Sequence, residues 1–220
     1  IIPPPSKSHT LRAILFASLI EKESHIKNFL DSPDINCMIE ACKTFGAVIK
    51  KNGDELIIKG KNPKNVKKFE KEIWVGNSGI CLRFLTAISA LFDFEVKIIG
   101  DLSICKNRPM APLLKSLSDM GAQIQSRNGF APICIKGPIT AKKVDIDGWD
   151  SQFVSALIIA AVFLGNEIVI TVKNLAEIPW VKTTLFWLDF LNIKYQKKQN
   201  NQFVIYNNQN LKGFKYFVPA

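Results

Sequence analysis

The chain has 220 residues, of which 47% are hydrophobic and 22% are charged, so it can build a substantial core and is not a disordered chain. Its formal net charge of +10 favours an acidic partner, such as a phosphorylated metabolite, a nucleic acid or an anionic surface. The longest apolar run, 153–165, is shorter than the roughly 20 residues that span a bilayer, so we expect no membrane partner. Five cysteines without CxxC spacing and two histidines form no metal-binding pattern, which predicts no metal and a reducing, cytoplasmic compartment.

Hydrophobic periodicity and turn residues predict alternating helices and strands along the whole chain. The first part should contain a helix over 8–20, a strand over 24–29, a helix over 34–45 capped by Asp34, a hairpin of 47–51 with 55–59, and a strand over 73–75. The second should contain a buried helix that closes 76–91, a strand over 95–99, a helix over 109–120, a hairpin of 122–126 with 133–136, and a strand over 144–147. The third should contain a buried helix over 151–164, a strand over 167–172, a helix over 179–191, and a hairpin of 194–197 with 203–206.

The order of these elements repeats, and so do some of the residues. FGAVIKKNGDELIIKG at 45–60 resembles MGAQIQSRNGFAPICIKG at 120–137, and a weaker third copy occupies 191–207. Each unit is a strand, an amphipathic helix, a hairpin, a strand and a buried helix. Three such units predict a single α/β domain over 1–220 with pseudo-threefold symmetry and repeats at roughly 6–75, 76–148 and 149–220.

Each expected buried helix begins with polar residues: SKSH at 6–9, GNSG at 76–79 and DSQ at 150–152. A helix start leaves free backbone N–H groups and a partial positive charge, which suit an anion. Taken singly, Ser8 and Ser151 are equally explained as helix caps, and Arg83 as a core arginine whose head reaches solvent. Because the repeat places the three starts in equivalent positions, we expect their cations and hydroxyls to converge on one face that binds a small polyanion.

Four motifs resemble those of the 5-enolpyruvylshikimate-3-phosphate synthases, in the order and spacing of that family. They are PSKSHTLRA at 5–13, GNSGICLRFLTA at 76–87, NRPM at 107–110 and DSQFVSAL at 150–157. The resemblance covers essentially the whole chain. It implies an inside-out α/β barrel of three βαβαββ units, the first of two such domains, with 1–5 as a crossover segment and 216–219 as a strand that leads back to the second domain.

The resemblance also implies an activity and a set of site residues. The family transfers the enolpyruvyl group of phosphoenolpyruvate to the 5-hydroxyl of shikimate 3-phosphate, without a cofactor. The residues that match its phosphoenolpyruvate motifs are Lys7, Gly79, Arg108 and Gln152. Those that match its shikimate 3-phosphate motifs are Lys7, Ser8, Arg12, Ser151 and Gln152. Lys7 and Gln152 are the expected catalytic residues, and Asn77 and Arg83 are expected to support the site.

The sequence departs from the family pattern at two positions near the expected sugar-phosphate site. The family usually has Ser-Ser-Gln where this chain has Asp150-Ser151-Gln152, and Ser-Lys-Pro-Tyr where 177–180 is Glu-Ile-Pro-Trp. A carboxylate repels a phosphate unless it is paired with a cation or protonated. The departures at Asp150 and Glu177 therefore put the details of that site in question.

Two other functions remain open at this point. The sister enzyme, UDP-N-acetylglucosamine enolpyruvyl transferase, usually has Lys-Asn in its first motif, whereas this chain has Lys7-Ser8. A basic nucleic-acid-binding module would agree with the net charge, but the aromatic residues lie mainly in apolar helices, so we expect no nucleic-acid partner. We expect a monomer that acts on small molecules. The chain by itself should be inactive, because the family's general base lies in the second domain.

Overall fold

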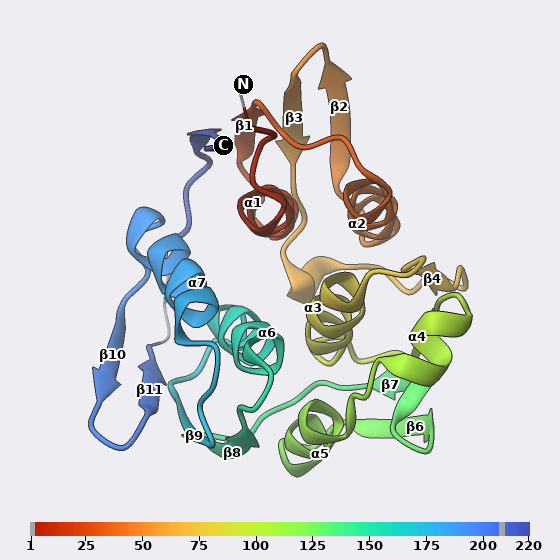
Figure 1. The fold of residues 1–220 in the computed structure, drawn as a ribbon, viewed down its shortest axis with the longest axis vertical. Coiled ribbons are helices and arrows are strands. Elements are labelled where there is room, and N and C mark those ends of the chain that lie inside the picture. Colours follow the sequence, from red (N-terminus) through yellow and green to blue (C-terminus); the bar gives the residue numbers. More distant parts are fainter. Residues whose placement is uncertain (1–2, 207–209) are drawn as a thin grey trace. The chain divides into compact units, whose positions relative to one another are not determined.

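The computed structural model describes residues 3–206 and 210–220. The chain divides into two compact units, which are described separately (Figure 1). Unit 1 contains the residues up to Lys71 together with Leu211–Ala220, and unit 2 contains Glu72–Asn210. Residues 1–2 of the expected crossover segment lie outside the described residues.

Unit 1 is one four-stranded sheet with two long helices. Its elements are α1 (Lys7–Leu19), β1 (Glu23–Lys27), α2 (Pro33–Thr44), β2 (Val48–Asn52), β3 (Glu55–Lys59), a short 3-10 turn over Pro63–Asn65, and β12 (Lys215–Phe217). The strand order is β12-β1-β3-β2, with β12 parallel to β1 and the other pairs antiparallel. Every residue of α1 from Thr10 to Leu19 is buried, which confirms that this helix lies in the core.

Unit 2 repeats the same arrangement twice. Its first half contains β4 (Ile73–Trp74), α3 (Gly79–Ser89), β5 (Val96–Ile99), α4 (Leu102–Asn107), α5 (Ala111–Asp119), β6 (Gln123–Arg127) and β7 (Phe130–Lys136). Its second half contains β8 (Lys143–Asp147), α6 (Ser151–Val162), β9 (Ile168–Lys173), α7 (Ile178–Phe190), β10 (Tyr195–Lys198) and β11 (Gln202–Ile205). The helices α3 and α6 lie side by side and are almost entirely buried (Figure 1).

The three sheets have the same strand order. In each, the second strand has a parallel neighbour on one side and an antiparallel hairpin on the other. The orders are β12-β1-β3-β2, β4-β5-β7-β6 and β8-β9-β11-β10. The first strand of the first repeat therefore comes from the far end of the chain, as β12. That the three repeats form a single threefold domain stays a prediction.

A glycine follows the second hairpin strand in two of the repeats, and the packing of the chain explains why. Gly60 follows β3 and Gly137 follows β7, and each donates its N–H to a carbonyl at the end of a buried helix or just after it. A Cβ on Gly60 would collide with the carbonyl oxygens of Ala17 and Ile20, and one on Gly137 with the carbonyl oxygen of Ala90. Only glycine permits this close approach of strand and helix end.

The structure corrects several details of the expected elements. Ser32, not Asp34, caps α2, because its Oγ accepts the N–H of Ile35. The helix expected over 109–120 begins only at Ala111, and the short helix α4 precedes it. Asp101 starts α4 by accepting the N–H of Ile104, and Pro109 disfavours a helical backbone at the preceding residue, so the two helices stay separate.

Candidate anion-binding site

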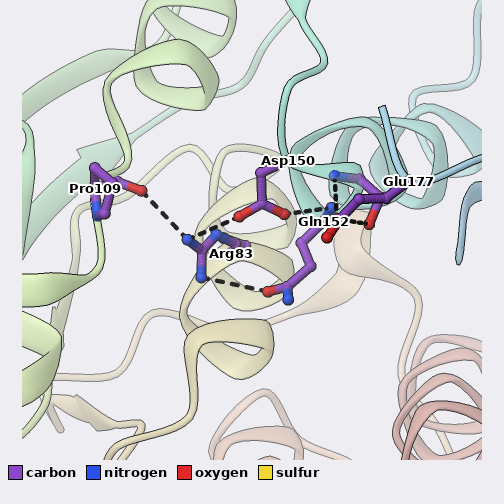
Figure 2. A network of polar contacts seen from close by, with 6 residues as sticks. Arg83, Pro109, Asp150, Gln152 and Glu177 are labelled. Atoms are coloured by element: carbon purple, nitrogen blue, oxygen red, sulfur yellow. Dashed lines mark hydrogen bonds and ion pairs between the residues drawn. The ribbon is translucent and has the colours of Figure 1, made fainter. Parts of the chain in front are cut away.

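The candidate site in unit 2 is built around Arg83, a charged side chain in the apolar helix α3. Its side chain is only 4% exposed, so its charge requires partners. Figure 2 shows the guanidinium between the turn before α5 and the start of α6. One terminal nitrogen lies 3.0 Å from a carboxylate oxygen of Asp150 and donates to the carbonyl of Pro109 at 3.5 Å, and the other donates to Oε1 of Gln152 at 3.3 Å.

Asp150 connects α3 to α6 through the two oxygens of one carboxylate. Oδ2 forms the ion pair with Arg83, and Oδ1 accepts the backbone N–H of Gln152 at 2.8 Å, which caps the start of α6. Its side chain is 14% exposed, so this is a largely buried ion pair. A pair of this kind offsets the cost of burying its charges only when its hydrogen bonds are satisfied. Both carboxylate oxygens have partners, whereas Nε of Arg83 is buried without one among the described residues.

Gly79 and Arg108 lie against the same guanidinium. A Cβ built on Gly79 would lie 2.5 Å from Nη1 of Arg83 and 3.4 Å from Cδ of Arg108. A side chain at position 79 would therefore displace one or both arginines, which explains why the first residue of α3 is glycine. Arg108 is exposed, and Gln152 is half-buried. The structure thus brings Gly79, Arg83, Arg108 and Gln152 together in unit 2, and that they bind a substrate stays a prediction.

The electrostatics of the site follow from these contacts. Burial lowers the pKa of Arg83, the carboxylates of Asp150 and Glu177 act in the opposite direction, and the nearby charge of Arg108 lowers it further. The guanidinium carbon also lies 5.1 Å from the centre of the Phe153 ring, a favourable position for a cation. Arg83 is therefore an internal charge that the protein itself neutralises, whereas Arg108 presents its charge to solvent.

Ser151 contacts a second carboxylate, that of Glu177. Oε2 of Glu177 accepts the backbone N–H of Ser151 at 3.2 Å and its hydroxyl at 2.8 Å. Ser151 is therefore not the cap of α6. Its hydroxyl and N–H are both occupied by the residue that precedes α7.

The other candidate residues lie in unit 1, at the start of α1. Ser6, not Ser8, caps this helix by accepting the N–H of His9 at 3.4 Å. Lys7 is 51% exposed and lies 3.7 Å from Asp34. Arg12 is buried and donates to the carbonyl of Ser8 at 3.1 Å, and burial lowers its pKa to about 10, so it remains charged at neutral pH.

The end of the described chain also contacts the start of α1. The N–H of Ser6 donates to the carbonyl of Pro219 at 2.7 Å, and the Tyr216 hydroxyl forms a 2.7 Å hydrogen bond with Nδ1 of His9. Burial and the charge of Arg12 lower the pKa of His9. The strand β12 thus fixes the start of α1 within unit 1.

Some expected features of the site depend on how the two units combine. That Lys7, Ser8 and Arg12 share one face with the residues of unit 2 stays a prediction. Asn77 is exposed in the turn before α3, where it is close in sequence to Gly79. In the part of the chain that the structure describes, no group of three or more His, Cys, Asp or Glu residues is placed to hold a metal. Nor does any helix in that part have the length and apolar character to cross a membrane.

Two contacts in the structure of the site were not predicted from the sequence. The ion pair between Arg83 and Asp150 joins residues 67 positions apart, and the contact of Glu177 with Ser151 joins two helix starts. The sequence did contain a signal for both contacts, because Asp150 and Glu177 are carboxylates at positions where the family usually has serine. The sequence indicated that each would need a partner but not which one.

Comparison of the sequence with known proteins shows the family of the chain. The family model for EPSP synthase (3-phosphoshikimate 1-carboxyvinyltransferase) matches residues 1–220. The 3-phosphoshikimate 1-carboxyvinyltransferase of Chlamydia muridarum is 45% identical over 99% of this chain and 49% of its own length. That of Acetivibrio thermocellus is 37% identical over 99% of this chain and 51% of its own length.

A solved structure gives the same result at the level of the fold. The EPSP synthase of Acinetobacter baumannii superposes with a TM-score of 0.87 at 25% identity, covering 100% of this chain and 49% of that chain. This agreement confirms the expected inside-out α/β fold. The chain spans about half the length of the curated relatives that it matches, and it belongs to the EPSP synthase (3-phosphoshikimate 1-carboxyvinyltransferase) family.

Proposed function

We propose that this chain supplies part of an enzyme that transfers the enolpyruvyl group of phosphoenolpyruvate to the 5-hydroxyl of shikimate 3-phosphate. The observation that supports it most directly is the cluster of Gly79, Arg108 and Gln152 around Arg83 in unit 2: the first three match the family's phosphoenolpyruvate motifs, and Arg83 is the expected supporting residue. The family match and the relatives favour neither the UDP-N-acetylglucosamine enzyme nor a nucleic-acid-binding module.

The proposed reaction proceeds by addition and elimination. The methylene carbon of phosphoenolpyruvate takes up a proton and becomes a methyl group, while the 5-hydroxyl oxygen attacks C2 and loses its proton. The resulting tetrahedral intermediate then loses one methyl proton and inorganic phosphate, and the double bond re-forms. In this scheme the exposed guanidinium of Arg108 pairs with phosphoenolpyruvate oxygens beside Gly79. Arg83 positions the amide of Gln152, which faces both substrates.

Three residues of unit 1 match the family's substrate motifs, and we propose that they also contact the substrates. Lys7 is exposed and only loosely paired with Asp34, so its ammonium group is available to both substrates. Ser8 and Arg12 would hold shikimate 3-phosphate together with Ser151 and Gln152. We also expect a monomer. The five cysteines are free and have no CxxC spacing, which favours a reducing, cytoplasmic compartment.

The test is transfer activity in a protein that joins this chain to the second half of the Chlamydia muridarum relative. Phosphate release that depends on both substrates is the expected result. Arg108→Ala should lower kcat/KM by about 100-fold to 1,000-fold, the usual effect of removing a preorganised charged contact. Lys7→Ala should have a similar effect.

The matched controls are Arg127→Ala and Lys50→Ala, which remove exposed cations from β6 and β2. Equal activity in Arg108→Ala, Lys7→Ala and these controls would contradict the proposed roles. A folded, inactive wild-type protein whose affinity for a DNA or RNA oligonucleotide falls steeply with salt would instead support the nucleic-acid-binding alternative.

A further inference from the structure

The end of the described chain holds the first turn of α1 at two points. The N–H of Ser6, the cap of this helix, donates to the carbonyl of Pro219 at 2.7 Å. Further along the turn, Nδ1 of His9 forms a 2.7 Å hydrogen bond with the hydroxyl of Tyr216. Residues 7–8, which match substrate motifs of the family, lie between these two held residues. The candidate site residues of this turn are therefore held from both sides by one segment.

That segment is fixed in turn by the sheet of unit 1. The strand β12 pairs with β1, and Tyr216 lies opposite Ile26 in the register. The N–H of Val218 donates to the carbonyl of Lys27 at 3.0 Å, and the side-chain amide of Asn28 donates to the carbonyl of Val218 at 2.8 Å. The hydroxyl of Tyr216 is thus presented to α1 by a paired strand.

The hydrogen bond between Tyr216 and His9 joins two uncharged groups at neutral pH. Burial raises the pKa of Tyr216 to about 12, so its hydroxyl keeps its proton. Burial and the charge of Arg12 lower the pKa of His9 below its ordinary value of 6.5, so its ring is neutral. Replacing Tyr216 by phenylalanine therefore removes the hydrogen bond and leaves the charge at the start of α1 unchanged.

Ser8 and Arg12 depend on the position of this turn. Ser8 directly precedes His9, and its carbonyl accepts a hydrogen bond from Nη1 of the buried Arg12 at 3.1 Å. A shift of the His9 backbone would therefore move the Ser8 carbonyl and, with it, the guanidinium. The N–H groups of a first helical turn have no acceptor within the helix, so contacts from outside the helix decide how firmly the turn is held.

We propose that Tyr216 is a positioning residue for the acceptor substrate. Its hydroxyl fixes the first turn of α1 through His9, and this holds Ser8 and Arg12 in the arrangement that binds shikimate 3-phosphate. The proposal deepens the proposed function and rests on it. The fold does not require the hydroxyl, because the pairing of β12 with β1 and the main-chain hydrogen bond of Ser6 are independent of it. The hydroxyl adds precision, and misplacing a binding group by about 1 Å can lower activity by about 100-fold.

The test is the kinetics of the protein that joins this chain to the second half of the Chlamydia muridarum relative. Tyr216→Phe should raise the KM for shikimate 3-phosphate by about fivefold to tenfold, as expected for the loss of one hydrogen bond. The kcat at saturating concentrations of both substrates should change by less than about threefold. A mere loss of folded protein would instead lower the apparent kcat and leave the KM unchanged.

The matched control is Tyr206→Phe in unit 2. It removes the hydroxyl that donates to Oε1 of Gln196 at 3.3 Å, and it should leave both kinetic constants unchanged. Equal KM values in Tyr216→Phe and this control would overturn the proposal.

A double-mutant cycle tests the route through His9. His9→Leu removes the ring nitrogen that Tyr216 contacts, so adding Tyr216→Phe to this variant should raise the KM by less than about twofold. The same increase in both backgrounds would show that Tyr216 does not act through His9 and would overturn the proposal.

NMR of the 220-residue chain without substrates separates this result from the proposed function. In Tyr216→Phe we expect lower order parameters for the Ser8 amide and for Nε–H of Arg12 than in the wild type, whereas Tyr206→Phe should not change them. Unchanged order parameters in Tyr216→Phe would overturn the positioning role. If the joined wild-type protein has no transfer activity, the proposed function fails, and these order parameters still decide whether Tyr216 positions the two residues.

Discussion

The starts of α1 and α6 have the same sequence pattern and opposite electrostatics. At α1 a neutral serine, Ser6, caps the helix, and the exposed Lys7 and buried Arg12 add positive charge. At α6 the cap is the carboxylate of Asp150, and the nearby cation, Arg83, belongs to another helix. The polar start before a buried helix is common to both, so we expect the charge of the cap to decide whether such a helix start accepts an external anion.

The largest effect should come from breaking the ion pair at α6. Replacing Arg83 by Met leaves the carboxylate of Asp150 largely buried without its cation, which typically destabilises a protein by about 3 kcal/mol or more. Urea unfolding of the chain measures the change. Arg127→Met, at an exposed position, is the control and should change the free energy of unfolding by less than about 0.5 kcal/mol. Similar losses in the two variants would show that the pair contributes little.

The sequence predicted the elements of the fold better than the contacts of the site. The apolar runs of α1, α3 and α6 and the Asn52-Gly53 turn are local signals, and each indicates its structure without knowledge of the rest. Sequence reasoning predicted Asp34 as a cap and left Ser8 and Ser151 open as alternative caps, but the structure has the caps at Ser32, Ser6 and Asp150. Several polar residues stand together at each start, and only the backbone conformation decides which of them caps the helix.

The partners of Asp150 and Glu177 depend on the tertiary structure. Asp150 contacts a residue of α3, and Glu177 stands before α7, so neither contact follows from spacing along the chain. The resemblance to the family nevertheless identified both positions, because a carboxylate replaced an expected hydroxyl at each. The sequence therefore indicated where the site differs, and the structure shows how each charge is accommodated.

The next effect concerns the close packing of Gly79 beneath Arg83. In Gly79→Ala the new methyl group would lie 2.5 Å from Nη1 of Arg83, so the guanidinium must move away from Asp150 and Gln152. We expect a loss of about 1 to 3 kcal/mol in the free energy of unfolding, as for other overpacked sites. In an Arg83→Met background the same substitution should cost much less. An equal cost in both backgrounds, measured as a double-mutant cycle, would contradict this explanation.

A smaller effect is expected from pH at the start of α1. The pKa of His9 is lowered in the folded chain by burial and by Arg12, so the unfolded chain binds a proton more readily. The contribution of His9 to stability is therefore complete above the unfolded pKa of about 6.5, and it is lost as the pH falls through the folded pKa. The stability difference between the wild type and His9→Gln should shrink on going from pH 7.5 to pH 5. A constant difference across that range would contradict the assignment.

The smallest change in stability should come from replacing the serine cap of α1 with an aspartate, the residue that caps α6. Aspartate and serine cap helices about equally well, so Ser6→Asp should change the free energy of unfolding by less than about 0.5 kcal/mol. The added carboxylate would nevertheless place a negative charge at the first turn of α1, beside Lys7. It should weaken phosphate binding there, measured as the response of the His9 amide in an NMR titration with inorganic phosphate. Ser32→Asp, which makes the same exchange at the cap of α2, is the matched control and should leave the His9 response unchanged. If Ser6→Asp and Ser32→Asp have the same effect on that response, the charge of the cap does not control anion binding, and the contrast between α1 and α6 must have another cause.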